Sequence, residues 1–142
     1  MSRAKQARHL HGPVHQGIKV LMPDPQGLQR DLDLTLEPGW VSVDFVNTGV
    51  PHVVIQVEDL SGHPVVNQGR TLRYHPRFAP AGTNADFLSV VGPDRIEMRT
   101  YERGVEDETL ACGTGAIASA LVAAHRGMVQ SPVSVKTRGG DV

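Results

Sequence analysis

Short stretches of alternating apolar and polar residues, rich in β-branched side chains, dominate this chain. A period of two is typical of strands that bury one face. The stretches that follow this pattern are residues 18–22, 32–36, 41–46, 53–57, 96–101 and 133–137. Segments rich in proline and glycine separate them as turns, at residues 23–27, 37–39 and 92–94. Their close spacing predicts hairpins in a largely antiparallel sheet.

One clear helix is expected, from Ala116 to Ala124, where strong helix formers run without proline and Gly127 is suited to the position just past the helix end. This run is apolar on all sides, which is typical of a helix enclosed by other structure. Residues 67–75 are expected to form a second, shorter helix. We therefore predict an α+β fold in which a mostly antiparallel, curved sheet wraps around one central helix.

The two ends of the chain differ from its middle. A length of 142 residues fits one domain. Residues 1–16 show no clear periodicity and are expected to be a disordered extension, with residues 17–142 forming the domain. Gly139 and Gly140 favour a hairpin turn, but the chain stops at Val142, before a return strand is expected to form. We expect a shortened domain whose open edge pairs with a second copy or with a missing segment.

Charge argues against several classes of partner. The formal net charge is -1 and no block of Lys or Arg occurs, so neither nucleic acid nor an anionic membrane is an expected partner. No apolar stretch follows the basic start or approaches membrane-spanning length, so a cytoplasmic setting is expected. His9, His11 and His15 lie close together, but Pro13 interrupts any helix there, and we expect no metal site.

Cys112 is the only cysteine, and it lies directly before the predicted helix. The unpaired N–H groups and partial positive charge of a helix N-terminus favour anions, both a thiolate and a substrate carboxylate. Such a position lowers the pKa of a thiol below its usual value of about 8.5. The competing interpretation is a small buried hydrophobic residue. The glycines after Cys112 leave room for a ligand and favour an activated thiol.

Four segments in order along the chain resemble the diaminopimelate epimerase family. The first two are residues 47–52, Asn-Thr-Gly-Val-Pro-His, and residues 69–87. The others are residues 101–104, Tyr-Glu-Arg-Gly, and residues 108–115, Glu-Thr-Leu-Ala-Cys-Gly-Thr-Gly. The last two together are highly specific, and the similarity runs from about residue 18 to the end.

The resemblance implies an isomerase that uses no cofactor. The family interconverts LL- and meso-diaminopimelate in lysine and cell-wall biosynthesis, with a site between two similar domains. Each domain supplies one cysteine, and the two act as base and acid on opposite faces of the α-carbon. This chain resembles the second domain. The motif of the first domain is absent, so we expect a missing N-terminal domain as partner and no complete epimerisation by the chain alone.

Three catalytic residues follow from the resemblance. Cys112 matches the second cysteine, and Glu102 matches the carboxylate that hydrogen-bonds it. His52 matches the histidine paired with the first domain's cysteine, so it is expected to lack its partner here. Without the resemblance, Glu102 would be interpreted as a solvated carboxylate and His52 as a structural histidine.

Five residues are expected to bind substrate. The planar guanidinium of Arg103 can bind a carboxylate through two hydrogen bonds, and the family places it on the substrate. Asn84 matches the family asparagine that binds the distal amino-acid end of the substrate. Gly113 and Thr114 are expected to present N–H groups to the α-carboxylate, with helix capping as the competing role of Thr114. Asn47 is expected to take over a contact made elsewhere in the family.

The chain departs from the family pattern in two places. Val50 occupies a position where some members carry a substrate-binding asparagine, which is why Asn47 is considered in its place. Glu106 and Asp107 lengthen the stretch between Gly104 and Glu108 by one residue, which alters the geometry expected of that loop.

Two alternative functions stay open from the sequence alone. One is a non-catalytic module that binds an amino acid, and the other is a related isomerase of the same fold, such as a proline racemase. A reactive thiol at Cys112 separates an enzyme from a binding module, because binding alone does not require it. A pair of identical chains, each bringing Cys112 to one cleft, is a further alternative.

Overall fold

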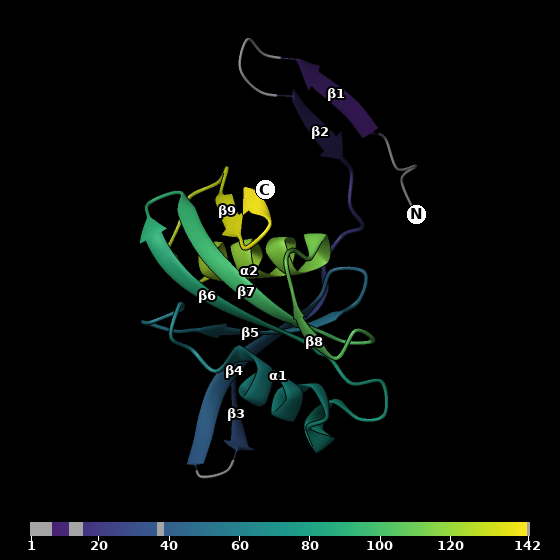
Figure 1. The fold of residues 1–142 in the computed structure, drawn as a ribbon, viewed down its shortest axis with the longest axis vertical. Coiled ribbons are helices and arrows are strands. Elements are labelled where there is room, and N and C mark those ends of the chain that lie inside the picture. The colour runs from purple at the N-terminus through teal and green to yellow at the C-terminus, as the bar shows by residue number, and fades with distance from the viewer. Residues whose placement is uncertain (1–6, 12–15, 37–38, 142) are drawn as a thin grey trace.

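One eight-stranded sheet forms the frame of the protein in the computed structural model, which describes residues 7–11, 16–36 and 39–141. Its strands lie in the order β10-β9-β7-β6-β5-β4-β3, and β8 also pairs with β7 (Figure 1). The strands are β3 (Gln26–Leu36), β4 (Gly39–Asn47), β5 (Pro51–Gln56), β6 (Asn84–Gly92), β7 (Arg95–Glu102), β8 (Asp107–Thr109), β9 (Ser134–Thr137) and β10 (Gly140–Asp141).

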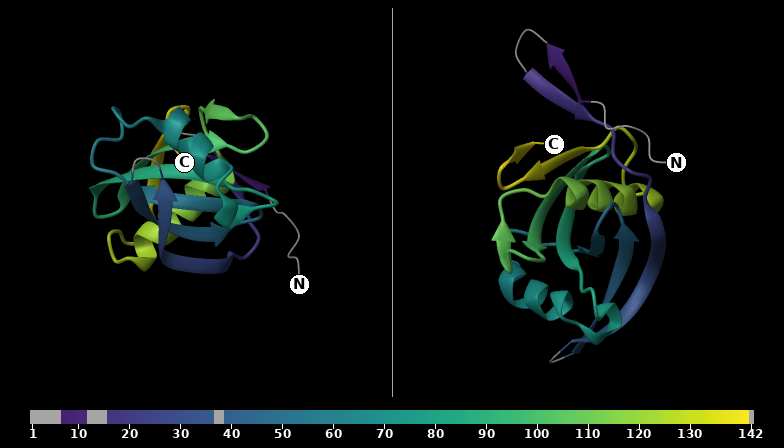
Figure 2. Two further views of the ribbon diagram at one scale, coloured as in Figure 1. Left: turned by 90° about the horizontal axis from the view of Figure 1, so that it is seen from below. Right: turned by 90° about the vertical axis from the view of Figure 1, so that its right-hand side faces the viewer.

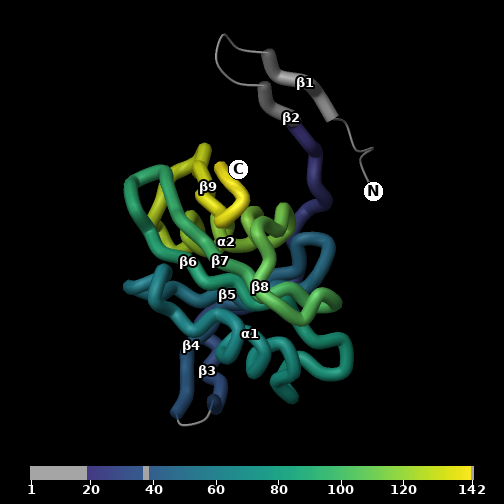
Figure 3. The backbone as a smooth tube through the Cα atoms, in the orientation of Figure 1, coloured from purple at the N-terminus to yellow at the C-terminus, as the bar shows by residue number. Residues whose placement is uncertain are grey.

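Two helices cover the sheet, one on each face. The parallel strands β5 and β6 are connected through α1 (Val65–Arg73) and the 3-10 helix η1 (Pro76–Phe78), and the parallel strands β7 and β9 through α2 (Gly113–His125). Because β7 runs antiparallel to β6, the usual right-handed connection places the two helices on opposite faces. Figure 2 shows α2 and α1 on either side of the sheet, and Figure 3 shows the path of the backbone between them.

Each helix closes its own hydrophobic core. Alternate side chains of β5 point to opposite faces, so Val53 and Ile55 pack in the core under α1 while Val54 packs in the core under α2. The side chains of α2 buried in this second core are those of Ala116, Ala118, Val122 and Ala123. These small side chains let α2 lie close to the sheet, which fixes its first turn against β5 and β6.

The predicted fold class is confirmed: the chain is an α+β protein with a curved, mostly antiparallel sheet and α2 packed on it. All six expected strands are present, and the expected second helix is α1. The sequence did not indicate the buried strand β6 or the three-residue strand β8. The return strand that was not expected does form, because β10 pairs with β9 through Gly140 and Thr137.

The N-terminal segment contains a hairpin. β1 (Ala7–His11) pairs antiparallel with β2 (Gln16–Val20) as a separate two-stranded sheet (Figure 1). Part of the expected extension therefore has strand structure, while residues 1–6 and 12–15 lie outside the described residues. Among the residues described, no helix is both long and apolar enough for a membrane span. No group of three or more potential metal ligands occurs among them, and the side chains of His9, His11 and His15 are not among those described.

Candidate active site

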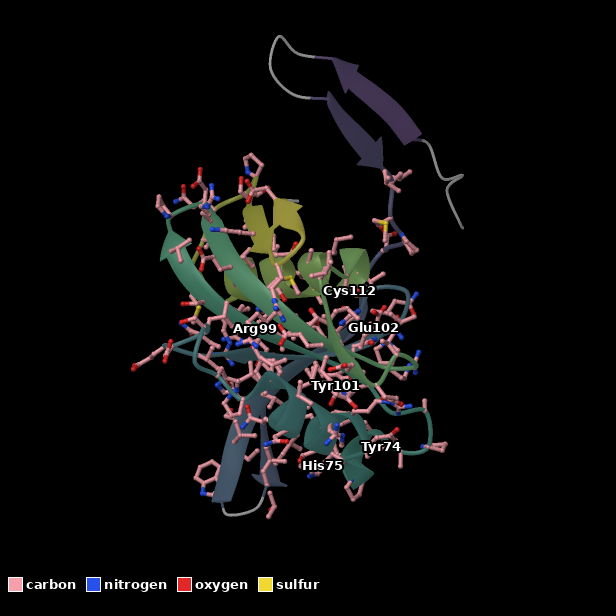
Figure 4. All side chains as sticks on the ribbon, in the orientation of Figure 1. Tyr74, His75, Arg99, Tyr101, Glu102 and Cys112 are labelled. Carbon is pink, nitrogen blue, oxygen red and sulfur yellow. The ribbon has the colours of Figure 1, made fainter. Side chains whose placement is uncertain are left out.

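Cys112 caps the N-terminus of α2, as the sequence predicts (Figure 4). Its backbone is extended, its side chain is half-buried, and it is a free thiol. Sγ lies 3.5 Å from the hydroxyl oxygen Oγ1 of Thr114. The thiol therefore lies at the N-terminus of α2, beside the hydroxyl of Thr114.

Thr114 connects the thiol to His52. Its Oγ1 lies 2.8 Å from Nε2 of His52. Its backbone carbonyl accepts a hydrogen bond of 2.8 Å from the Thr48 hydroxyl, which holds the residue in place. No side-chain capping bond forms at this end of α2, so the Thr114 hydroxyl is directed at His52 and does not cap the helix.

His52 was expected to lack a partner in this chain, but both ring nitrogens have one. Nδ1 donates to Oδ2 of Asp86 at 2.6 Å, and both side chains are fully buried. The second carboxylate oxygen of Asp86 accepts a hydrogen bond of 2.8 Å from the hydroxyl of Thr100. The pair forms because β5 and β6 are parallel neighbours. Their register places His52 opposite Asn84, which lies two residues before Asp86 on β6.

Gly115 allows α2 to approach this pair. A Cβ atom at that position would lie 2.7 Å from Oδ1 of Asp86 and 3.2 Å from Cε1 of His52. Contacts of this length do not fit an ordinary side chain, so the absence of a Cβ is what places the first turn of α2 over the pair.

Electrostatics shift the pKa values of His52 and Cys112 in opposite directions. Burial alone would lower the pKa of His52, but the charge and hydrogen bond of Asp86 outweigh it and raise the pKa to about 9. Burial alone would raise the pKa of Cys112, but the neighbouring His52 imidazole, the Thr114 hydroxyl and the N–H of Gly115 lower it overall. Sγ and the imidazole make no direct hydrogen bond in the described structure, so the geometry assigns their contact to Oγ1 of Thr114.

Glu102 lies at the end of β7, half-buried (Figure 4). Within the described residues its carboxylate has no hydrogen-bond partner, so the expected bond to Cys112 is not formed here. The backbone carbonyl of Glu102 instead accepts the N–H of Glu106 at 2.8 Å and starts the turn that leads to β8. Its role toward the thiol stays a prediction.

Asn84 is buried and bonded to backbone groups. Its Nδ2 donates to the carbonyl of Pro51 at 2.9 Å, and its Oδ1 accepts the backbone N–H of Arg103 at 2.8 Å. With 3% of its surface exposed, Asn84 connects the start of β5 to the turn that carries Arg103. Contact with a substrate stays a prediction, and it would fall to the second N–H of the same amide.

Arg103 and Asn47 line an open cleft of about 520 Å³. Nη1 of Arg103 donates to the carbonyl of Ala81 at 3.1 Å, and none of the described carboxylates forms an ion pair with its guanidinium. Oδ1 of Asn47 accepts the N–H of Gly49 at 2.9 Å. Gly113 is exposed, with no atom within 4 Å of the place where a Cβ would lie. Arg103 is therefore able to accept an external carboxylate at this cleft.

The lengthened loop is held by its own contacts. Glu106 takes up the extra residue with a φ of 59°, and its carboxylate accepts from Nε of Arg73 at 3.0 Å and from the hydroxyl of Tyr74 at 2.7 Å. Further along, Arg99 donates to both oxygens of Glu108, at 2.6 and 2.8 Å. These contacts fix the segment that leads to Cys112.

Asp86, Thr100 and Gly115 were not identified as site residues from the sequence. Asp86 lies in a segment that matches the family, but the stretch does not reveal its partner. His52 and Asp86 meet only through parallel pairing of strands that the connection through α1 separates. A single sequence carries no signal for such a pair.

The fold resembles that of two solved structures. A probable proline racemase from Agrobacterium radiobacter with bound carbonate superposes with a TM-score of 0.69 at 15% identity, over 99% of this chain and 52% of that chain. A hydroxyproline epimerase from Agrobacterium vitis with bound trans-4-OH-L-proline gives 0.68 at 17% identity, with the same coverage. At this identity the likeness shows the fold alone.

Sequence comparison identifies the family. The model of diaminopimelate epimerase matches residues 45–142. The diaminopimelate epimerase of Aquifex aeolicus is 49% identical over 126 residues, which are 88% of this chain and 45% of that protein. That of Chlamydia trachomatis serovar L2 is 50% identical over 107 residues, 75% of this chain and 39% of that protein. The chain belongs to the diaminopimelate epimerase family, which is a family of isomerases, and it spans less than half the length of these relatives.

Proposed function

We propose that this chain supplies one half of the active site of a cofactor-independent epimerase that interconverts LL- and meso-diaminopimelate in lysine biosynthesis. The observation that carries the proposal is Cys112 at the N-terminus of α2, in the same site as the buried pair of His52 and Asp86. Membership of the diaminopimelate epimerase family supports the choice of substrate.

Cys112 is the proton-transfer group. Its thiolate takes the α-proton: the C–H bond breaks, an S–H bond forms, and the electron pair left on carbon is shared with the α-carboxylate. The N–H groups of Gly113 and Thr114 hold that carboxylate, where the helix N-terminus stabilises the added negative charge. The reverse step returns a proton from Sγ, so one thiol serves as base and acid on its own face of the substrate.

We propose that the cleft lined by Arg103 and Asn47 takes the distal end of diaminopimelate. Its carboxylate binds the guanidinium of Arg103, and its amino group is within reach of the amide of Asn47. Asn84 holds the backbone of Arg103 in position for this contact. The cleft has room for an aliphatic chain with two charged groups at its end.

A second proton-transfer group must come from elsewhere. The chain contains one cysteine, whereas inversion requires groups on both faces of the α-carbon. We propose that the second is a cysteine of another domain, since the chain spans less than half of its relatives. Glu102 would join the proton transfer of Cys112 once substrate and that domain close over it. The chain alone is then expected to exchange a proton without inverting the centre.

Exchange of the α-proton in deuterium oxide tests this proposal. The chain is incubated with LL- and with meso-diaminopimelate, and deuterium at the α-carbon is followed by mass spectrometry and NMR. The expected result is exchange with retention, which Cys112→Ala abolishes. Exchange that survives Cys112→Ala, or no exchange by the folded chain at high substrate, would overturn the assignment of Cys112.

A further inference from the structure

We propose that Gly139 is a positioning residue for Cys112: its backbone N–H holds the connection that leads into α2 and so fixes the place of the thiol at the helix N-terminus. This inference deepens the proposed function and rests on it for its catalytic meaning. The sequence indicated a hairpin turn at Gly139 and Gly140, and the proton transfer proposed above assigns these two glycines no role.

The connection before α2 is short and lies outside the regular elements. Residues 110–112 join the end of β8 to the start of α2 and belong to neither. The N–H of Gly139 donates to the carbonyl of Leu110 at 2.7 Å. Among the residues described, this is the backbone hydrogen bond that ties Leu110 and Ala111 to another part of the fold. The hairpin of β9 and β10, which contains Gly139, lies beside α2 (Figures 1 and 2).

A second contact from the same hairpin holds the segment one step earlier. Nη1 of Arg138 lies 3.1 Å from Oε2 of Glu108, whose side chain is 6% exposed and also binds Arg99. Arg138 directly precedes Gly139. The turn of the hairpin therefore contacts the segment at Glu108 and again at Leu110, on the way to the thiol.

The two glycines of the turn are required for different reasons. Gly140 has a φ of 129°, a backbone conformation that residues with a Cβ rarely adopt. The φ of Gly139 is not positive, so its backbone conformation does not require glycine. A Cβ at Gly139 would lie 3.2 Å from the carbonyl oxygen of Leu110 and 3.3 Å from its Cβ, whereas a Cβ at Gly140 would meet no atom within 4 Å. Glycine at position 139 therefore serves the close approach to Leu110.

The position of the thiol affects proton transfer in two ways. A misplacement of about 1 Å in a reacting group can lower a rate about 100-fold. The N–H of Gly115, in the first turn of α2, is among the groups that lower the pKa of Cys112. A thiol moved away from the helix N-terminus is therefore ionised less at neutral pH. Both effects depend on where the connection held by Gly139 places Cys112.

A purely structural role of the hairpin is the competing explanation. The bond from Gly139 to Leu110 also joins the hairpin to the rest of the fold, so its loss lowers stability. A structural role alone changes the fraction of folded protein. It leaves the ionisation of Cys112 and the rate of proton transfer unchanged in the molecules that are folded. Both are measured at a temperature well below the Tm of every variant.

The test replaces Gly139 by valine, whose branched side chain pushes against Leu110. Alkylation of Cys112 by iodoacetamide is followed from about pH 5 to about pH 10, because the thiolate reacts and the thiol does not. We expect the midpoint of the pH profile to rise by about half a pH unit, which slows alkylation about threefold on the acid side. In exchange of the α-proton, we expect kcat to fall about tenfold while KM stays the same, because Gly139 makes no contact with substrate.

Thr137→Val is the matched control. The hydroxyl of Thr137 lies in the same hairpin, donates to the carbonyl of Gly140 at 2.7 Å and accepts from the N–H of Gly139 at 3.2 Å. Valine keeps the shape of the side chain and removes these two bonds, but it leaves the bond from Gly139 to Leu110. This variant is expected to lose stability and to keep the alkylation profile and kcat of the parent chain. If Gly139→Val does not fold, Gly139→Ala decides the question with a smaller shift in the same direction.

A parent-like alkylation profile or kcat in folded Gly139→Val, or in Gly139→Ala if the valine variant does not fold, would overturn the inference. An equal shift in Thr137→Val would overturn it too. The alkylation measurement uses no substrate. Failure of the inference would therefore show as an unchanged alkylation profile, while failure of the proposed function would show as absent or Cys112-independent exchange of the α-proton by the parent chain.

Discussion

Replacing Gly115 by alanine tests the close contact between α2 and the buried pair. The added methyl group would lie 2.7 Å from Oδ1 of Asp86 and 3.2 Å from Cε1 of His52. Asp86 cannot move away without loss, because its carboxylate is bonded to His52 and to Thr100. Gly113, two residues earlier in the same helix, has no atom within 4 Å of its Cβ position and provides the matched control.

The expected magnitude follows from two opposing effects. Alanine is favoured over glycine inside a helix by about 1 kcal/mol. Overpacking a rigid contact costs about 1 to 3 kcal/mol, and weakening a hydrogen bond to a charged group costs a further 1.5 to 3 kcal/mol, roughly. The net loss in free energy of unfolding for Gly115→Ala is then about 3 kcal/mol. This loss lowers Tm by about 10 °C for a chain of this size.

Urea and thermal denaturation, followed by circular dichroism, measure the difference between the two variants. Gly113→Ala is expected to be as stable as the parent chain or slightly more stable, since the helix propensity is gained without a clash. A Gly115→Ala variant as stable as Gly113→Ala would refute the packing argument.

Three further predictions concern other contacts. Gly69→Ala places a methyl group 2.4 Å from Cβ of Tyr101. This variant should lower the free energy of unfolding, measured by urea titration, by about 2 kcal/mol. An unchanged urea midpoint would contradict the close approach of α1 to β7. Glu108→Gln loses the bidentate bond from Arg99, at a cost of about 2 kcal/mol. This bond lowers the pKa of Glu108, so its stabilisation exists above the pKa of the unfolded chain and is lost as pH falls through the pKa of the folded chain. The loss of stability in Glu108→Gln, relative to the parent chain, should therefore shrink in acid. A loss of stability that does not depend on pH would be inconsistent with a charge effect. The raised pKa of His52 contributes stability that is full below the ordinary histidine pKa of about 6.5 and is lost as pH rises through about 9. The parent chain should therefore lose its stability advantage over His52→Gln across that pH window. A constant difference in urea midpoints would argue against the ion pair with Asp86.

Regular patterns in the sequence predicted much of the frame. Alternation of apolar and polar residues located β4 and β7, because each of these strands buries one face. The apolar run after Cys112 located α2, because this helix is enclosed by other structure. β6 was not predicted because five consecutive residues, Asn84 through Leu88, are buried, so its sequence shows no alternation. β8 is too short to show any period.

The candidate site was only partly predictable for a related reason. Cys112 precedes its helix directly, so a local pattern placed it at the helix N-terminus. The His52–Asp86 pair depends on parallel pairing of β5 with β6, a long-range contact that no local pattern encodes. The amide of Asn84 bonds to the backbone of Pro51 and Arg103, which no local pattern indicated, and its contact with a substrate stays a prediction.

Epimerisation by a chimeric protein tests the central claim most directly. This chain replaces the matching segment of the Aquifex aeolicus diaminopimelate epimerase, to which it is 49% identical. Conversion of LL- to meso-diaminopimelate is measured for the chimera and for its Cys112→Ala variant, with circular dichroism to confirm folding of both. We predict conversion that depends on Cys112. A folded chimera that does not convert the substrate, or one that converts it equally well without Cys112, would contradict the assignment of this chain as the half of the site that carries a catalytic thiol.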